Sequence, residues 1–170
     1  MPARGAGHRA PVYDARVSAA ELLERHPLLS RLTLEQIERI AAAGELETFA
    51  EREEIVREGS PSDALYLVLT GKVGVTKHGH PLAELPPGEF FGEMALVEPA
   101  PRSASVHALT QSFVFRLPFV ALQHLLEHDA TAFNAVLVQI VKTLSDRLRH
   151  ANNLVSSVGE LADWLAGSLV

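Results

Sequence analysis

The stretch from Phe91 to Val106 holds the residues best suited to chemistry. Gly92 has no side chain, so the backbone there can approach a ligand closely. A short helical turn is expected after Glu93, and its free amide groups would point toward an anion. Arg102 carries a planar guanidinium that matches phosphate oxygens, whereas the Glu93 carboxylate would accept a hydrogen bond from a sugar hydroxyl. The stretch therefore predicts a paired clamp, one part for a phosphate and one for the sugar beside it.

A second group of candidate ligands lies in the segment His124-Leu125-Leu126-Glu127-His128, which matches a metallopeptidase motif. Two histidines four residues apart on a helix can share a metal ion. However, no third ligand follows in a suitable context, and histidines in the last turn of a helix also interact favourably with its dipole. We interpret the match as chance and expect no metal site. Because no nucleophile motif is recognisable either, we expect no catalytic residues and no enzyme activity.

The clamp lies within a region of short apolar runs separated by turns, from about residue 45 to residue 117. Residues 65–69 are apolar at every position, which predicts a strand buried on both faces. Val73 and Val75 alternate with less apolar residues, and residues 78–81 are typical of a hairpin turn. Several strands at this spacing predict a barrel or a sandwich.

Helices are expected before this region. Residues 18–21 and 33–36 each fit a capping box, so they predict two helices, one ending at Pro27 and the other at Gly44. Residues 1–16 contain few large apolar side chains and two prolines, and we expect them to form a flexible arm.

Helices are also expected after the region of predicted strands. Pro118 is a good first helical residue for a short helix that ends near Asp129, and a long C-terminal helix should cover residues 131–170. Apolar residues recur there at alternating spacings of four and three: Leu137, Val141, Leu144, Leu148, Ala151, Val155, Val158, Ala162, Leu165 and Leu169. Such a seam favours a partner helix, most simply from a second copy of the chain. Gly159 predicts a bend or break, and Arg147 falls on the polar side of the helix.

Composition bounds the class of protein. The chain has 170 residues, of which 47% are hydrophobic and 21% charged, enough for one globular domain with a real core. The net charge of −6 argues against nucleic acid or anionic membranes as partners. The sequence contains no cysteine, which excludes disulfides and cysteine-ligated metals. No apolar run suits a membrane span or a signal peptide, so we expect a cytoplasmic protein.

Residues 91–106 resemble the phosphate-binding cassette of the cyclic nucleotide-binding domain family. The family pattern is Phe-Gly-Glu-x-Ala-Leu, a short loop, and Arg-(Ser/Thr/Ala)-Ala-(Ser/Thr)-Val, and every fixed position is matched. Residues 49–71 and 85–90 are also similar, and the resemblance extends over about residues 20–155. It implies an α+β fold built on a β-roll, which is a jelly-roll-like double-stranded β-helix. This β-roll would lie between N-terminal helices and a long C-terminal dimerisation helix. The nucleotide-binding domain would cover residues 17–130.

The resemblance also implies a role for each site residue. Arg102 would bind the cyclic phosphate, and Glu93 would accept the ribose 2′-hydroxyl. The remaining ligand-binding residues would be Gly92, Met94, Ala95, Ser103, Ala104, Val75, Leu82 and Leu85, together with Asn152, which falls near the position that reaches the base in dimeric members. No cofactor is implied, and the ligand would be cyclic AMP or cyclic GMP. Ser103 favours cyclic AMP, because serine accompanies that nucleotide in dimeric bacterial members.

The function implied is that of a cyclic nucleotide receptor, a regulatory sensor in which ligand binding moves the flanking helices. Transcription activators of the family add a helix-turn-helix domain after the dimer helix. Only 18 residues follow Asn152, and none is lysine or arginine, so we expect a stand-alone sensor without direct nucleic acid contact. The alternative is a dimeric interaction module that does not need nucleotide. The downstream protein partner is not identified by the sequence.

Overall fold

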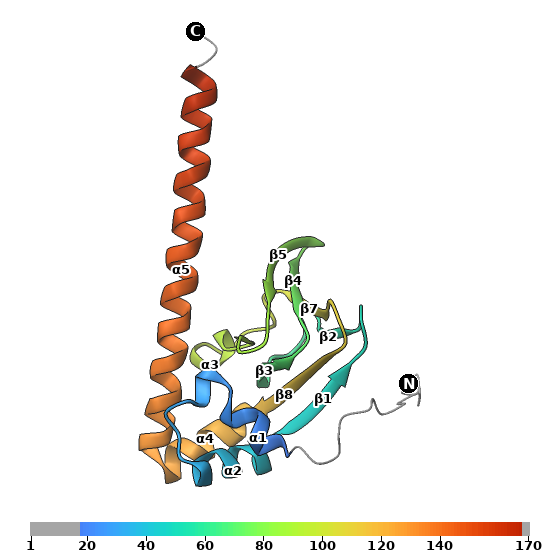
Figure 1. The fold of residues 1–170 in the computed structure, drawn as a ribbon, viewed down its shortest axis with the longest axis vertical. Coiled ribbons are helices and arrows are strands. Elements are labelled where there is room, and N and C mark those ends of the chain that lie inside the picture. Colours follow the sequence, from blue (N-terminus) through green and yellow to red (C-terminus); the bar gives the residue numbers. More distant parts are fainter. Residues whose placement is uncertain (1–17, 168–170) are drawn as a thin grey trace.

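The structure is a computed structural model that describes residues 18–167. Eight strands form two antiparallel four-stranded sheets, with the orders β1-β8-β3-β6 and β2-β7-β4-β5 (Figure 1). The strands are β1 (Glu45–Phe49), β2 (Glu54–Val56), β3 (Ala64–Thr70), β4 (Val73–Lys77), β5 (His80–Leu85), β6 (Phe90–Phe91), β7 (Ser105–Ala108) and β8 (Ser112–Pro118). The predicted β-roll is confirmed. The turn between β4 and β5 is tighter than predicted, because β5 already begins at His80.

Strand β3 explains why the two sheets and the helices form one body. Leu65 and Leu67 on one face of β3 pack in a core with the helices. Tyr66 and Val68 on the other face pack in a second core with residues from the opposite sheet, Val73 among them. Because successive side chains of a strand point to opposite faces, an all-apolar strand can serve two cores at once. The prediction of a strand buried on both faces is confirmed.

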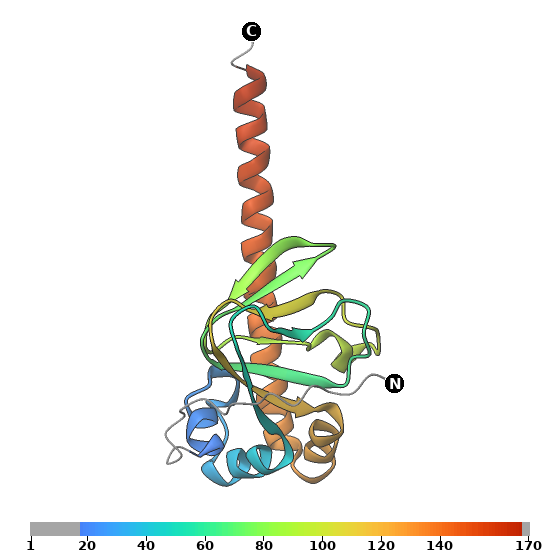
Figure 2. The same ribbon diagram turned by 90° about the vertical axis from the view of Figure 1, so that its right-hand side faces the viewer.

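The N-terminal helices begin where the sequence predicts. Helix α1 (Ala19–Glu24) and helix α2 (Leu34–Ala43) both have complete capping boxes, at Ser18 and at Thr33. A short 3-10 helix, Pro27–Leu29, lies between them. Figure 2 shows these helices gathered with α4 at one end of the β-roll.

Two further helices complete the chain, α4 (Phe119–His128) and α5 (Ala130–Gly167). Pro118 ends strand β8 and caps α4, so it is not the first helical residue that we predicted. The prediction of a break at Gly159 is also wrong, because α5 is continuous through it. Residues 1–16, the predicted arm, and 168–170 lie outside the described residues.

Helix α5 has a buried half and an exposed half. Val136 and Ile140 pack into the helical core. From Val141 to Val158 the apolar seam is exposed, and the helix extends well beyond the rest of the molecule (Figures 1 and 2). Within residues 18–167, no helix combines the length and the apolar character that crossing a membrane would require.

A buried histidine makes stability depend on pH. His26 is only 3% exposed, its Nδ1 accepts a hydrogen bond from the Leu28 amide at 3.2 Å, and its Nε2 lies 3.2 Å from the carbonyl oxygen of Glu89. Burial lowers the pKa of His26 below the usual 6.5. The unfolded chain therefore takes up this proton at a higher pH than the folded chain does. We expect the free energy of unfolding to fall as the pH drops below 6.5, by up to about 1.4 kcal/mol per pH unit for one proton.

Urea denaturation of the wild type and of His26→Gln between pH 5 and pH 8 measures this contribution. The variant should be less stable at pH 8, because it loses well-placed buried hydrogen bonds, and its stability should change less between pH 7 and pH 5. Equal pH dependence in the two proteins would show that His26 does not carry the effect.

Candidate ligand-binding site

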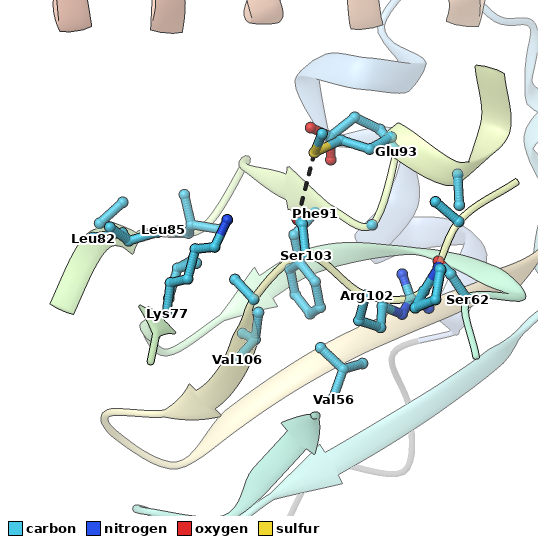
Figure 3. A pocket seen from close by; sticks show the side chains of 18 of the residues that line it. Val56, Ser62, Lys77, Leu82, Leu85, Phe91, Glu93, Arg102, Ser103 and Val106 are labelled. Atoms are coloured by element: carbon cyan, nitrogen blue, oxygen red, sulfur yellow. Dashed lines mark hydrogen bonds between the residues drawn. The ribbon is translucent and has the colours of Figure 1, made fainter. Parts of the chain in front are cut away.

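A cavity of about 470 Å³ opens between the cassette, strands β4 and β5, and helix α5. Figure 3 shows the side chains that surround it. The short helix α3 (Met94–Val97) and the loop that leads to β7 form one wall. All the site residues predicted from the sequence line this cavity except Asn152: Val75, Leu82, Leu85, Gly92, Glu93, Met94, Ala95, Arg102, Ser103 and Ala104. The volume lies in the range of small-molecule sites.

Arg102 is the most unusual side chain of the cavity, because it is 6% exposed and only partly paired. Its Nη2 donates a hydrogen bond to the carbonyl oxygen of Ala64 at 2.9 Å, and Asp63 lies 3.8 Å away. Its Nε and Nη1 are buried without a hydrogen-bond partner. Desolvation lowers the pKa of Arg102, while Tyr66 and Asp63 oppose that change. A buried guanidinium with two free donors is suited to an anion that accepts from both.

The surroundings of Arg102 hold it in this position. Its backbone pairs in both directions with the turn before β3, through bonds of 2.8 Å to Gly59 and Ser60. The guanidinium carbon lies 5.3 Å from the ring centroid of Tyr66, and the Tyr66 ring stacks in parallel on Phe91. This ring pair supports the guanidinium from one side.

Gly92 makes the close approach to Arg102 possible. Its φ is +87°, and a Cβ atom there would lie 2.3 Å from Nη1 of Arg102 and 2.8 Å from the carbonyl oxygen of Ala64. Any larger residue would strain the backbone and displace the guanidinium. The sequence predicted that Gly92 allows a close approach of the backbone, and the short distances to Arg102 and Ala64 give the physical reason why a glycine is needed there.

Glu93 is 8% exposed, and its Oε1 lies 3.5 Å from Nη1 of Arg147 on α5. Arg147 makes stronger contacts nearby: its Nη2 donates to Oε2 of Glu89 at 2.7 Å and to the carbonyl oxygen of Phe90 at 2.6 Å. Its guanidinium also lies 4.9 Å from the Phe90 ring centroid. Arg147 thus ties the long helix to the cassette.

The sequence analysis missed this role of Arg147, which we expected on the polar side of the helix. It also missed Lys77, although Lys77 follows Val75 by two residues and strand alternation places both on one face. Asn152 is exposed on α5 and does not line the cavity, so its contact with a base stays a prediction. The Ser103 hydroxyl donates to the Met94 sulfur at 3.5 Å.

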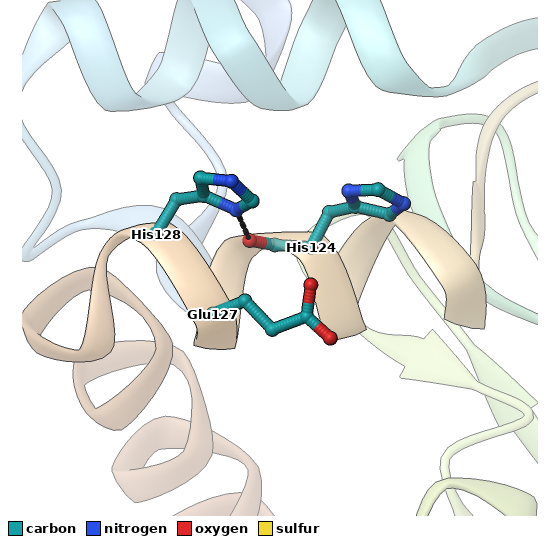
Figure 4. Close-up of side chains that lie close together, drawn as sticks. All are labelled: His124, Glu127 and His128. Atoms are coloured by element: carbon teal, nitrogen blue, oxygen red, sulfur yellow. Dashed lines mark hydrogen bonds between the residues drawn. The ribbon is translucent and has the colours of Figure 1, made fainter.

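The three candidate metal ligands lie together on the surface of α4 (Figure 4). One ligand atom from each of His124, Glu127 and His128 falls within 4.8 Å of the others, and all three residues are exposed. Nδ1 of His128 lies 2.8 Å from the carbonyl oxygen of His124. The three residues do not line the cavity of Arg102, and our expectation of no metal site stays a prediction.

The two packed sheets with a buried arginine at a cavity define a small-molecule-binding β-roll. Residues 46–129 match the family model described as cyclic nucleotide-binding domain. The chain is 39% identical over 116 residues to the cAMP-dependent protein kinase regulatory subunit of Neurospora crassa, an alignment that covers 67% of this chain and 30% of that protein. Residues 46–129 therefore belong to the cyclic nucleotide-binding domain family.

Two solved structures resemble the chain in fold. A cyclic nucleotide-binding domain from Methylobacillus flagellatus is 27% identical, with a TM-score of 0.69, and the alignment covers 79% of this chain and 78% of that one. The catabolite activator protein of Thermus thermophilus is 28% identical, with a TM-score of 0.65 and coverage of 78% and 63%. The chain spans less than a third of the length of the curated relatives that it matches.

Proposed function

We propose that this domain is a cytoplasmic receptor for a cyclic nucleotide, cyclic AMP or cyclic GMP, with a regulatory role and no catalysis. The observation that carries the proposal is Arg102, buried beside the cavity with Nε and Nη1 unpaired. The cyclic phosphate has one negative charge and two exocyclic oxygens. Those oxygens can accept from both free donors, which would satisfy the buried guanidinium.

Other features of the cavity agree with a nucleotide. The Glu93 carboxylate can accept a ribose hydroxyl. Val75, Leu82 and Leu85 offer apolar surface for the base, and all three line the cavity. The relative from Neurospora crassa is the regulatory subunit of a cAMP-dependent protein kinase, which supports the same class of ligand.

Thermal unfolding with added cyclic AMP or cyclic GMP tests the proposal. At a ligand concentration about 100 times the dissociation constant, binding should stabilise the fold by about 2.7 kcal/mol. Linear AMP and GMP are the controls, since their phosphates carry more charge and lack the ring. A dimer that shows no shift with either cyclic nucleotide would favour the alternative, an interaction module that does not need ligand.

We further propose that Arg147 couples the cavity to α5. Its three polar contacts, with Glu89, Phe90 and Glu93, lie at the start of the cassette and in the residues just before it. The Glu93 carboxylate would be shared between Arg147 and the ribose. Binding at Glu93 would then change the contact of Arg147 with the cassette, so α5 would shift relative to the β-roll.

Replacing Arg147 with methionine should separate binding from this response. Methionine keeps an unbranched apolar stem for contact with Phe90 but removes every polar contact. We expect cyclic nucleotide affinity to change by less than about threefold, because Arg102 and most of the cavity remain, a change of about 0.6 kcal/mol. The ligand-dependent change in amide hydrogen exchange along residues 141–150 should disappear.

Arg149→Met is the matched control, because Arg149 pairs with Asp146 on the exposed side of the same helix. This variant should keep the full exchange response. An Arg147→Met protein that keeps the response would contradict the proposed coupling.

A further inference from the structure

We propose that Lys77 reads the base of the bound nucleotide and favours a 6-oxopurine such as guanine over adenine. This inference rests on the proposed function and names the ligand class of the same cavity.

The position of Lys77 carries the proposal. It is the last residue of β4, and it lines the cavity together with Val75. Figure 3 shows its side chain extending into the cavity, with Phe91 and Val106 between it and Arg102. A nucleotide whose phosphate lies at Arg102 and whose base lies against Leu82 and Leu85 would bring the base to the Lys77 ammonium.

The ammonium of Lys77 is free to act on a ligand. Within residues 18–167 it makes no hydrogen bond or ion pair, in contrast to Lys72, which directly precedes the same strand and whose Nζ lies 3.0 Å from Glu84. The cavity has two other cationic side chains, Arg102 and Arg147. Arg102 is the proposed phosphate ligand, and Arg147 is held by Glu89.

The chemistry of an ammonium sets the preference. Lysine has three donors and no acceptor. The edge of guanine that carries N7 and O6 offers two acceptors, whereas the same edge of adenine offers N7 and an amino group that itself donates. One ammonium can therefore bond to either atom of the guanine edge, and it meets a competing donor on adenine.

Asn152 and Ser103 are the two residues from which the sequence suggested base selectivity, and neither is placed as Lys77 is. Asn152 is exposed and outside the cavity, and the hydroxyl of Ser103 is directed to the sulfur of Met94. Among the residues that line the cavity, Lys77 is thus the side chain best placed to distinguish the bases. The inferred preference is opposite to the cyclic AMP preference that Ser103 suggested.

Calorimetric titration of cyclic AMP, cyclic GMP and cyclic IMP into three proteins tests the inference: wild type, Lys77→Met and Lys72→Met. Cyclic IMP shares O6 and N7 with cyclic GMP but lacks its 2-amino group, so it separates recognition of O6 from recognition of the amino group. The wild type should prefer both oxopurines. Lys77→Met should lose about three- to tenfold in affinity for these two ligands, the effect of one solvent-open hydrogen bond, and less than about twofold for cyclic AMP. Lys72→Met should behave as the wild type.

Each other outcome has a distinct meaning. Equal losses for all three nucleotides would show that Lys77 acts through charge on the phosphate, and no loss would show that it is solvated; both overturn the inference while leaving the receptor intact. A loss for cyclic GMP alone would overturn recognition of O6 and N7. Failure of the wild type to bind any cyclic nucleotide would overturn the proposed function itself.

Discussion

Replacing Arg102 with alanine should lower cyclic nucleotide affinity by about two to three orders of magnitude. Truncating one partner of a buried, hydrogen-bonded charge pair costs about 2–5 kcal/mol, since the other charge is left buried without its partner. The immediate surroundings of the Arg102 side chain offer little to replace it, because Tyr66, Phe91 and Val106 are apolar or aromatic. The anion donors that remain near Arg102 would be backbone amides of the cassette and the hydroxyls of Ser62 and Ser103.

The same substitution should leave the fold intact. Arg102 has two buried donors without partners, so its burial already carries an unfavourable term that alanine removes. Alanine also loses the 2.9 Å bond to Ala64 and the contact with the Tyr66 ring. These effects oppose each other, and we expect the unfolding free energy to change by no more than about 1 kcal/mol.

Three further variants sharpen the Arg102 experiment. Arg102→Lys keeps the charge but loses the planar fork, so it should bind with intermediate affinity. Glu93→Ala should cost only about tenfold, because one hydrogen bond to the ribose is lost. Arg57→Ala is the control, since Arg57 is an exposed arginine that pairs with Glu54. Wild-type affinity in Arg102→Ala, measured by calorimetry, would contradict the assignment of the phosphate site.

The cassette could be predicted from the sequence because its chemistry is local. Gly92 and Glu93 are adjacent, and Arg102 returns to them through a short loop, so residue types and spacing define the clamp. The capping boxes at Ser18 and Thr33 are local in the same sense. Patterns within a few residues contain the physical cause of each of these features.

The contacts of Arg147 could not be predicted in this way, because its partners Glu89 and Phe90 lie 58 and 57 residues earlier in the chain. The helical pattern predicted only on which side of α5 Arg147 lies. The residues that this side contacts are determined by the packing of α5 against the β-roll. The continuity of α5 at Gly159 has a related cause. A glycine costs a helix about 1 kcal/mol, which weakens a helix without fixing where it ends.

A local irregularity in strand pairing is a further reason why part of the cavity wall could not be predicted from the sequence. The register between β4 and β5 shifts between Val75 and Thr76. Val75 pairs with Ala83 and Thr76 pairs with Pro81, so Leu82 has no partner in the β4–β5 register. Such a bulge breaks strict alternation. As a result both Leu82 and Ala83 line the cavity, whereas alternation from the sequence would have placed only one of them there.

The exposed half of α5 predicts that the protein is a dimer, and Leu148→Glu should convert it to monomers. Leu148, Val155 and Val158 are 62%, 73% and 67% exposed, although they belong to one apolar seam. Pairing with a second helix would bury this seam, at about 25 cal/mol per Å² of apolar surface. A glutamate at position 148 would place two like charges opposite each other in a parallel pair and would bury them without partners.

Light scattering at micromolar concentration measures the effect directly. The wild type should have twice the 18.4 kDa mass of one chain, and Leu148→Glu should have the mass of a single chain. His150→Glu is the matched control, because it adds the same charge two residues away on the side of α5 opposite the seam, and it should remain dimeric. Most of the stability of a helix in a protein comes from packing of its apolar face, so the monomeric variant should also lose helical circular dichroism. A wild type that has the mass of one chain while keeping its full helical signal would show that α5 needs no partner, and the dimer proposal would then be wrong.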